Sequence, residues 1–423
     1  MVLNSDRFYQ TFAGMVDMAK YAFGTAHDEE LLYQPAYQYA LEKRAMGYHV
    51  PFQPQGSEIG AFYGEEVNHL SRMIAADVKA KYDAGQTACS KHFVSTGNHN
   101  TNYSGTRSPA ELIDSWLVGW KASLDAGTQW IMAHNGGGRT AGIIPPYDSE
   151  TLSILRNDLG YEGIIVTGWP LFVTYPTATG ITVDGKDLSQ MTPGKLYTQM
   201  PEAGIDLFGG YIVIGGTDTT IMDATNANFS FGGGPTFVLT NWPDVIKAEV
   251  EVGRCDMELI LRSCRRVLRN KFELGLFENP YPHPENVLEL FASDAYKADQ
   301  FPSETIDDVY AARKDSLNAL EERLQTESAV LLKNDASILP LSKDMKVFVT
   351  GSSKETAKMD REAVAAYAQV VDTLAEADVV IARVTSMDDN TEMIIEDAAS
   401  AGKPVVLVAQ VGNKENEIST TVA

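Results

Sequence analysis

Short apolar runs alternate with amphipathic segments along most of the chain, and this order constrains the fold more than any other feature. The runs have the length of buried strands and end in polar or glycine-rich turns. A strand that is followed by a helix pairs in parallel with the next strand, because the helix carries the chain back to the starting edge. The predicted strands are 47–52, 87–93, 130–134, 163–167 and 204–207. The predicted helices are 28–46, 65–82, 108–126, 148–159 and 244–274.

A stretch rich in proline and polar residues follows the helix that ends in FELGLFENPY. A chain of 423 residues exceeds one ordinary domain, so a linker is expected, and we assign it to 280–306. Beyond it, a helical segment at 307–332 precedes apolar runs that again alternate with helices, which predicts a second parallel sheet. These runs are 346–351, 379–384 and 405–411. The predicted domains are 1–279 and 307–423.

Charge and hydropathy exclude two classes of partner. The formal net charge of −23 would repel phosphate backbones, so we expect no nucleic acid. No apolar run is long enough to cross a bilayer, so we expect no membrane span. The start, MVLNSDRFYQ, shows no secretory leader, and the cytoplasm is the default expectation for a location that the sequence otherwise leaves undetermined.

No motif indicates a metal or a cofactor. Cys89, Cys255 and Cys264 form no CxxC or other metal-ligand spacing and are too few for a disulfide framework, so we interpret them as buried or idle thiols. The turn GSSKET after VFVTG lacks both the GxGxxG and the GxxxxGK spacing of phosphate-binding loops. We therefore expect neither a metal nor a cofactor.

Candidate functional residues stand at the carboxyl ends of the predicted strands. In a closed parallel barrel the loops at these ends converge on one cavity, and the chemistry is found there. The residues at these positions are Lys91, His92, His134, Gly168, Trp169 and Asp206. A lyase or aldolase that uses Lys91 as a Schiff-base amine is one interpretation, but it needs an apolar pocket, and His92 and several acids lie nearby.

The order of several motifs resembles glycoside hydrolase family 3 over residues 21–411. FYGEE is similar to the family's SFGEDP turn, ACSKHFVSTGN to its KHF-x-G motif, and GYEGIIVTGWP to its GFDGFVVSDW motif. GIDLFGG resembles the strand AGxDLLM, RRVLRNKFELGLFENPY the helix and linker signature, and ESAVLLKNDASILPLS the start of the second domain. AFGTAHDEELLYQPAYQYALEKRAMGYHVPFQP resembles the segment in which a helix leads into a barrel strand.

This resemblance implies an α/β protein, with a (β/α) TIM-like barrel followed by a smaller α/β sandwich domain. It implies retaining hydrolysis of β-linked sugars from the non-reducing end, with the Asp of the SDW motif as nucleophile. Gly168 occupies that position, and glycine has no side chain that could attack. The acid/base loop is shortened to VTSMDDNTEM, where Asp388, Asp389 and Glu392 are the substitutes. The family's RDPRWGR motif, which supplies a sugar-binding arginine, is absent, and its first barrel strands have no counterpart before residue 4.

The resemblance also assigns the binding residues. Lys91 and His92 match the family's two ligands of sugar hydroxyls, although a lysine–carboxylate pair is the structural alternative. Trp169 would stack on the CH face of a sugar or pack in the barrel. His134 stands where the family often has Tyr, and a lone histidine is more often structural. Asp206 would give a supporting hydrogen bond.

Two hypotheses follow for the function. The first is a β-glycosidase whose nucleophile is replaced by Gly168, by engineering or in a variant gene, and which is either inactive or able to act as a glycosynthase. The second is a natural non-catalytic relative that binds a glycan or serves as an assembly subunit. An incomplete barrel exposes unpaired strand edges, so we also expect a second copy or a complementing chain to cover them.

Overall fold

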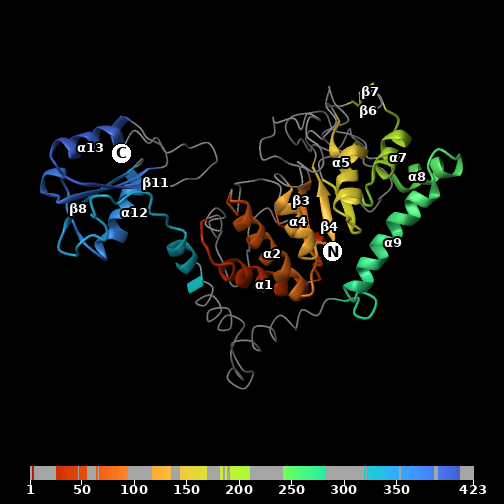
Figure 1. The fold of residues 1–423 in the computed structure, drawn as a ribbon, viewed down its shortest axis with the longest axis horizontal. Helices are drawn as coiled ribbons and strands as arrows, with labels where there is room; N and C mark the ends of the chain where they lie inside the picture. Colours follow the sequence, from red (N-terminus) through yellow and green to blue (C-terminus); the bar gives the residue numbers. More distant parts are fainter. Residues whose placement is uncertain are drawn as a thin grey trace, which may run out of the picture. The chain divides into compact units, whose positions relative to one another are not determined.

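The protein divides into two compact units, Met1–Ala329 and Val330–Ala423. The structure is a computed structural model (Figure 1). It describes residues 2–3, 25–45, 47–54, 63–64, 66–93, 117–134, 143–168, 182–183, 186–187, 191–209, 242–281, 319–320, 322–351, 354–384 and 389–409. Within these residues no helix is both long and apolar enough to cross a membrane.

A parallel sheet forms the centre of the first unit. Its strands β3 (Cys89–Phe93), β4 (Trp130–Ala133) and β5 (Ile164–Thr167) pair in the order β3-β4-β5. All pairs are parallel, as the alternation of strands and helices predicts. The expectation of an α/β fold with parallel sheets is confirmed.

Backbone contacts extend this sheet on both sides. Beside β3, the amides of Thr87 and Cys89 donate to the carbonyls of His49 and Gln53 at 3.0 and 3.1 Å, on either side of β2 (Val50–Pro51). β1 (Val2–Leu3) pairs in parallel with β2. On the side of β5, the strand predicted at 204–207 is reduced to a parallel bridge between Val166 and Leu207. A two-stranded antiparallel pair, β6 (Thr182–Val183) and β7 (Lys186–Asp187), lies in the same unit.

Helices fill the intervals between the strands. They are α1 (Glu30–Ala45), α2 (Val67–Asp83), α4 (Val118–Asp125), α5 (Ser149–Ser153) and α7 (Pro193–Ala203). Side-chain caps begin several of them: the Glu66 carboxylate accepts from the amides of Asn68 and His69 at the start of α2. After α5 the chain widens into a π-helical turn, Ile154–Asp158, so the helix predicted at 148–159 is not regular.

The single helix predicted over 244–274 is wrong, because the chain forms two helices there. α8 (Trp242–Glu251) ends just before Gly253, whose φ of 74° belongs to the left-handed region that favours glycine. α9 (Met257–Glu273) then begins at a new cap, where the Asp256 side chain accepts from the amide of Glu258. The apolar periodicity continues across the break, which explains the prediction.

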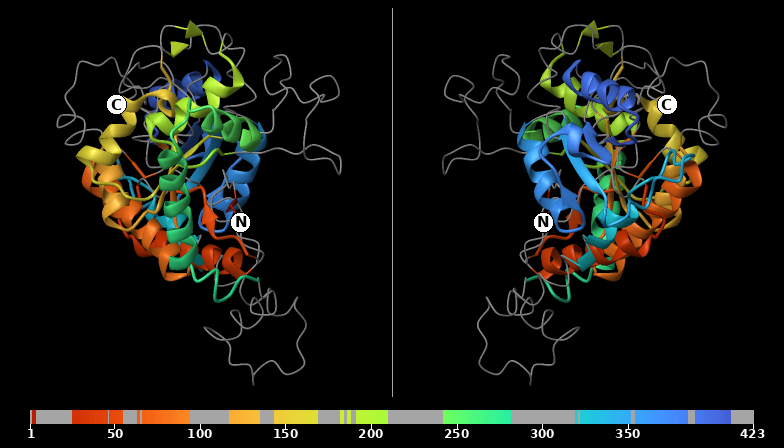
Figure 2. Two further views of the ribbon diagram at one scale, coloured as in Figure 1. Left: turned by 90° about the vertical axis from the view of Figure 1, so that its right-hand side faces the viewer. Right: turned by 90° about the vertical axis from the view of Figure 1, so that its left-hand side faces the viewer.

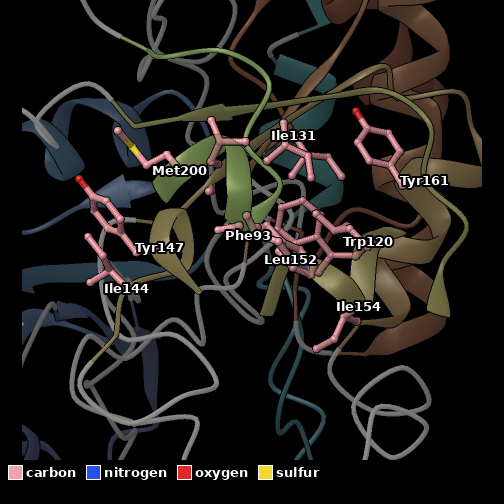
Figure 3. Packing of buried hydrophobic residues seen from close by; sticks show 14 of the residues in the cluster. Phe93, Trp120, Ile131, Ile144, Tyr147, Leu152, Ile154, Tyr161 and Met200 are labelled. Atoms are coloured by element: carbon pink, nitrogen blue, oxygen red, sulfur yellow. The ribbon is translucent and has the colours of Figure 1, made fainter. Parts of the chain in front are cut away.

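Both faces of the central sheet are buried. Side chains at alternate positions, such as Phe93, Ile131 and Ile165, pack against the helices in a cluster that includes Trp120. In Figure 3, Phe93, Trp120 and Leu152 lie together in this cluster, and the Phe93 and Trp120 rings meet edge to face at 5.1 Å. The opposite face carries a second apolar cluster, formed by Val50, Phe52, Cys89, Trp130, Met132, Ile164 and Val166.

The second unit contains a four-stranded sheet in the order β11-β10-β8-β9, with all pairs parallel. Its strands are β8 (Lys346–Gly351), β9 (Gln369–Val370), β10 (Val379–Val384) and β11 (Val405–Ala409). Two helices, α12 (Lys354–Ala365) and α13 (Asp389–Ser400), flank this sheet (Figure 1). The three apolar runs predicted as strands therefore form the strands of one parallel sheet.

Residues 319–329 belong to the first unit, although the sequence assigns them to the second domain. Leu320 and Leu324 pack on the apolar cluster of α1 and α2. The Arg323 guanidinium binds the Asp28 carboxylate at 2.5 Å, and the Thr25 hydroxyl donates to the Ser328 carbonyl at 3.0 Å. The division therefore falls after Ala329. Most of the predicted linker 280–306 lies outside the described residues.

Candidate functional site

The sheet register brings four of the predicted site residues to one edge. Ala133 of β4 pairs with Thr167 of β5, so His134 and Gly168 follow as neighbours at the ends of adjacent strands. Lys91 and His92 lie just before the last residue of β3, on the other side of β4, where the pairing with β4 shifts register. All three strands run in the same direction, and these residues therefore share the carboxyl edge of the sheet.

Lys91 and the two histidines supply hydrogen-bond donors at this edge. Lys91 is 2 % exposed, and its amide donates to the Pro54 carbonyl at 3.0 Å. The Lys91–His92 peptide bond is cis. The His92 and His134 rings meet edge to face, with centroids 5.6 Å apart and an interplanar angle of 64°. An ammonium group and two imidazole rings can each bind a hydroxyl group of a polar ligand.

Gly168 is buried at the end of β5 and brings no functional group to this edge. Its neighbour Thr167 cannot replace one, because adjacent residues of a strand point to opposite faces. The Thr167 hydroxyl in fact accepts a hydrogen bond from the amide of Gly209 at 2.8 Å. Val166, two residues earlier, belongs to the apolar cluster that includes Cys89, Trp130 and Met132. Residues 166–168 at the end of β5 therefore offer only backbone groups to a ligand at the carboxyl edge.

Asp206 lies away from these residues, beside the first half of β5. Its amide donates to the Ile165 carbonyl at 2.8 Å, and its carboxylate accepts from the Ile165 amide at 3.0 Å. Gly168 is three residues further along the strand, about 10 Å at the usual rise per residue. The structure thus separates Asp206 from the edge that carries Lys91 and Gly168.

The Asp206 carboxylate is fully buried and is neutralised by arginines. Arg156 binds one oxygen at 2.5 Å, and Arg266 of α9 binds the other at 2.7 Å. The Ser263 hydroxyl lies 3.3 Å from the latter oxygen. Burial lowers the pKa of the Arg156 guanidinium, while the charge of Asp206 opposes this shift. These contacts occupy the acceptor capacity of the carboxylate, which makes Asp206 a structural anchor for α9.

Sequence reasoning missed this arginine cluster, although a signal for it exists. The segment RRVLR at 265–269 places arginines on a helix that otherwise packs against the domain. Charged groups are rarely buried unpaired. Arginines on the packed side of a helix therefore indicate a buried acidic partner.

The remaining predicted site residues belong to the second unit or lie outside the described residues. Glu392 lies exposed on α13 of the second unit, and Asp389 begins that helix. Trp169 and Asp388 lie outside the described residues.

No metal centre is found in the part of the chain that the structure describes, where no group of three or more histidine, cysteine or acidic side chains could hold an ion. The three cysteines are free thiols: Cys89 and Cys255 are buried and Cys264 is exposed. Burial raises the pKa of the Cys89 thiol, which makes it a poor nucleophile.

Comparison with known proteins finds relatives among β-glucosidases, although no family model matches the chain. It is 24% identical over 312 residues to the probable β-glucosidase C of Aspergillus flavus, covering 69% of this chain and 41% of that protein. It is 24% identical over 328 residues to the lysosomal β-glucosidase of Dictyostelium discoideum, covering 72% of this chain and 32% of that protein. The chain thus spans less than half the length of these relatives.

Solved structures show the same fold. The β-glucosidase from Listeria innocua in complex with glucose superposes with a TM-score of 0.67 at 19% identity, covering 98% of this chain and 58% of that one. An exo-1,3/1,4-β-glucanase from a Pseudoalteromonas species gives a TM-score of 0.65 at 18% identity, covering 97% and 68%. At such identities the likeness concerns the fold. Together with the sequence relatives, it supports a glycoside hydrolase lineage for this chain.

Proposed function

We propose that the chain binds the non-reducing end of a β-linked glucoside, or of a related saccharide, at the carboxyl edge of β3, β4 and β5. The observation that carries the proposal is the convergence of Lys91, His92 and His134 on this edge through the sheet register. Their nitrogen atoms suit vicinal hydroxyl groups, which need several donors and acceptors within a small area. Relatives of this fold have been crystallised with glucose, gluconolactone and isofagomine, which are ligands of this chemical class.

The architecture that we propose around this site is a (β/α) barrel followed by an α/β sandwich domain. Its support is the succession of parallel strands in chain order, from β1 through β5 to Leu207, with helices between them. In such a barrel the inner face of the sheet leads to the carboxyl edge. Lys91 lies two residues after Cys89, which belongs to the inner cluster, so alternation places both on that face.

Hydrolysis with retention of configuration needs two carboxyl groups about 5 to 5.5 Å apart, one as nucleophile and the other as acid/base. In our proposal Gly168 holds the nucleophile position, so the protein forms no glycosyl-enzyme by itself. Asp388, Asp389 and Glu392 are the acid/base candidates. The protein would then be silent towards ordinary glycosides, or would act as a glycosynthase on activated ones.

A second candidate function is binding without catalysis, as a glycan-binding or assembly subunit. The observation that favours it is the use of the Asp206 carboxylate in a buried arginine cluster. Of the acids predicted for the site in the first unit, none stands at the carboxyl edge among the residues that the structure describes.

Hydrolysis of a panel of nitrophenyl β-glycosides tests the proposal, using the chain with Gly168 in the presence of azide or formate and the variant Gly168→Asp without them. Turnover in either case shows that the rest of the site is intact. Isothermal titration calorimetry of the chain with Gly168 against glucose and laminaribiose then tests binding alone. Lys91→Met should abolish binding, whereas the matched exposed replacement Lys121→Met should leave it unchanged. Silence in both assays would refute a sugar site at this edge.

A further inference from the structure

Strand β3 changes its register beside the two residues on which the proposed sugar site depends. Lys91 pairs with the third residue of β4, and Phe93, two positions later, pairs with the fourth. His92 is thus an extra residue in the ladder, as in a β-bulge, which re-aims side chains and interrupts regular pairing. The positions of Lys91 and His92 therefore depend on what fixes the chain immediately before and after them.

Ser90, directly before the pair, is held by two other hydroxyl groups. Alternation along the strand turns Ser90 to the face opposite Lys91. Its Oγ lies 2.5 Å from the Ser123 Oγ in α4 and 3.2 Å from the Thr128 Oγ1 in the turn before β4. The Ser123 and Thr128 hydroxyl oxygens are 2.7 Å apart, and all three residues are buried. A hydroxyl both donates and accepts, so this hydroxyl ring satisfies each of its members.

Phe93, directly after the pair, is held by the same helix. The Trp120 ring of α4 meets the Phe93 ring edge to face, and both side chains are buried (Figure 3). Trp120 and Ser123 are three residues apart and so share one side of α4. The helix itself lies beside α2 in the outer helical layer of the first unit (Figure 2). One helix therefore holds β3 on both sides of the Lys91–His92 pair.

We propose that Ser123 is a positioning residue, which acts through the hydroxyl ring to hold Lys91 and His92 where a sugar can bind them. The inference rests on the proposed function, because it concerns the same carboxyl edge. Hydrogen bonds are directional, whereas apolar contacts are not, so the ring fixes the register of β3 more strictly than packing alone would. Groups that bind a ligand need to be held within about 0.5 Å of their working positions.

Three replacements test the hydroxyl ring. Ser123→Ala removes its two shorter contacts, and Ser90→Ala removes the shortest one from the strand side. The matched control is Tyr161→Phe, which also removes one buried hydroxyl. That hydroxyl donates to the Ile164 carbonyl at 3.1 Å, at the amino end of β5 and thus away from the carboxyl edge.

The first measurement needs no ligand. The ring-proton chemical shifts of His92 and His134 in the full chain depend on the edge-to-face contact of the two rings, and the variants His92→Gln and His134→Gln assign the signals. We expect Ser123→Ala and Ser90→Ala to move these signals and Tyr161→Phe to leave them in place. Signals that stay in place in both alanine variants, or that move equally in Tyr161→Phe, would overturn the proposal.

The second measurement is the Kd of glucose, determined by isothermal titration calorimetry. Ser123→Ala should raise this Kd at least about tenfold, since a misplacement of about 1 Å can cost about 100-fold, and Tyr161→Phe should leave it unchanged. An unchanged Kd in Ser123→Ala would contradict the positioning role. If the parent chain does not bind glucose, the proposed function fails at this edge, and the histidine signals still decide whether the hydroxyl ring positions Lys91 and His92.

Discussion

The replacement Asp206→Asn gives the sharpest test of how the first unit is held together. Asparagine keeps the volume of the side chain and removes its charge, so no cavity is created. Arg156 and Arg266, whose side chains are each 15% exposed, then lose the anion that neutralises them. The Ile165 amide keeps an acceptor only if the asparagine oxygen takes the place of the lost carboxylate oxygen.

The magnitude follows from the burial of the pair. Removal of one partner of a buried ion pair costs about 3 to 5 kcal/mol, because the charge left behind is neither solvated nor paired. The same change at an exposed pair costs less than about 1 kcal/mol. We therefore expect Asp206→Asn to lower the free energy of unfolding of the first unit by about 3 to 5 kcal/mol. Asp125→Asn, at an exposed pair with Lys121, is the control.

Urea unfolding followed by tryptophan fluorescence isolates the unit in question. All 5 tryptophans, at positions 116, 120, 130, 169 and 242, lie in the first unit, so the signal does not report on the second. A loss of less than about 1 kcal/mol would refute the interpretation of Asp206 as an anchor, because that is the range of a surface pair. If Asp206→Asn leaves the free energy of unfolding unchanged and abolishes sugar binding, Asp206 belongs to the ligand site instead.

Three further outcomes are expected of the first unit. Trp120→Ala should destabilise it by about 3 to 5 kcal/mol in the same urea assay, since the indole is buried against Phe93. Gly163→Ala should lower the melting temperature, because the added Cβ would lie 2.4 Å from the Gln129 carbonyl oxygen. Burial, assisted by the nearby Arg44 charge, lowers the pKa of His49 to about 4. The unfolded state therefore binds the proton first, and stability should fall as the pH drops from 6.5 towards 4. His49→Gln should flatten that slope.

Local signals in the sequence were sufficient for most of the elements. The apolar runs at β4 and β5 stand out because strands buried on both faces need continuous apolar residues. Prediction failed at α8 and α9, where the apolar periodicity outweighed two local signals, the glycine at 253 and the Asp256 cap. The periodicity of α8 and α9 runs through the turn at Gly253, so the pattern alone gives one helix.

In the candidate site, too, local sequence signals place some residues correctly and fail for another. Lys91, His134 and Gly168 are at strand ends that the sequence identifies, and parallel pairing in chain order is enough to place them on one edge. Asp206 lies near the end of the strand predicted at 204–207, but that strand is only a bridge at Leu207. Its position along β5 depends on a register between segments about 40 residues apart, which no local pattern encodes.

The sequence by itself determined the α/β class, the order of the strands, and the residue types that stand at their ends, because these depend on periodicity and chain order. Only the tertiary structure decided which charges meet. It paired Asp206 with Arg156 and Arg266, and it turned α9 so that Ser263 and Asn270 are buried while Leu268 and Phe272 are exposed. Such outcomes depend on the rotation and register of packed elements, which are fixed by the contacts of the whole unit rather than by any one segment.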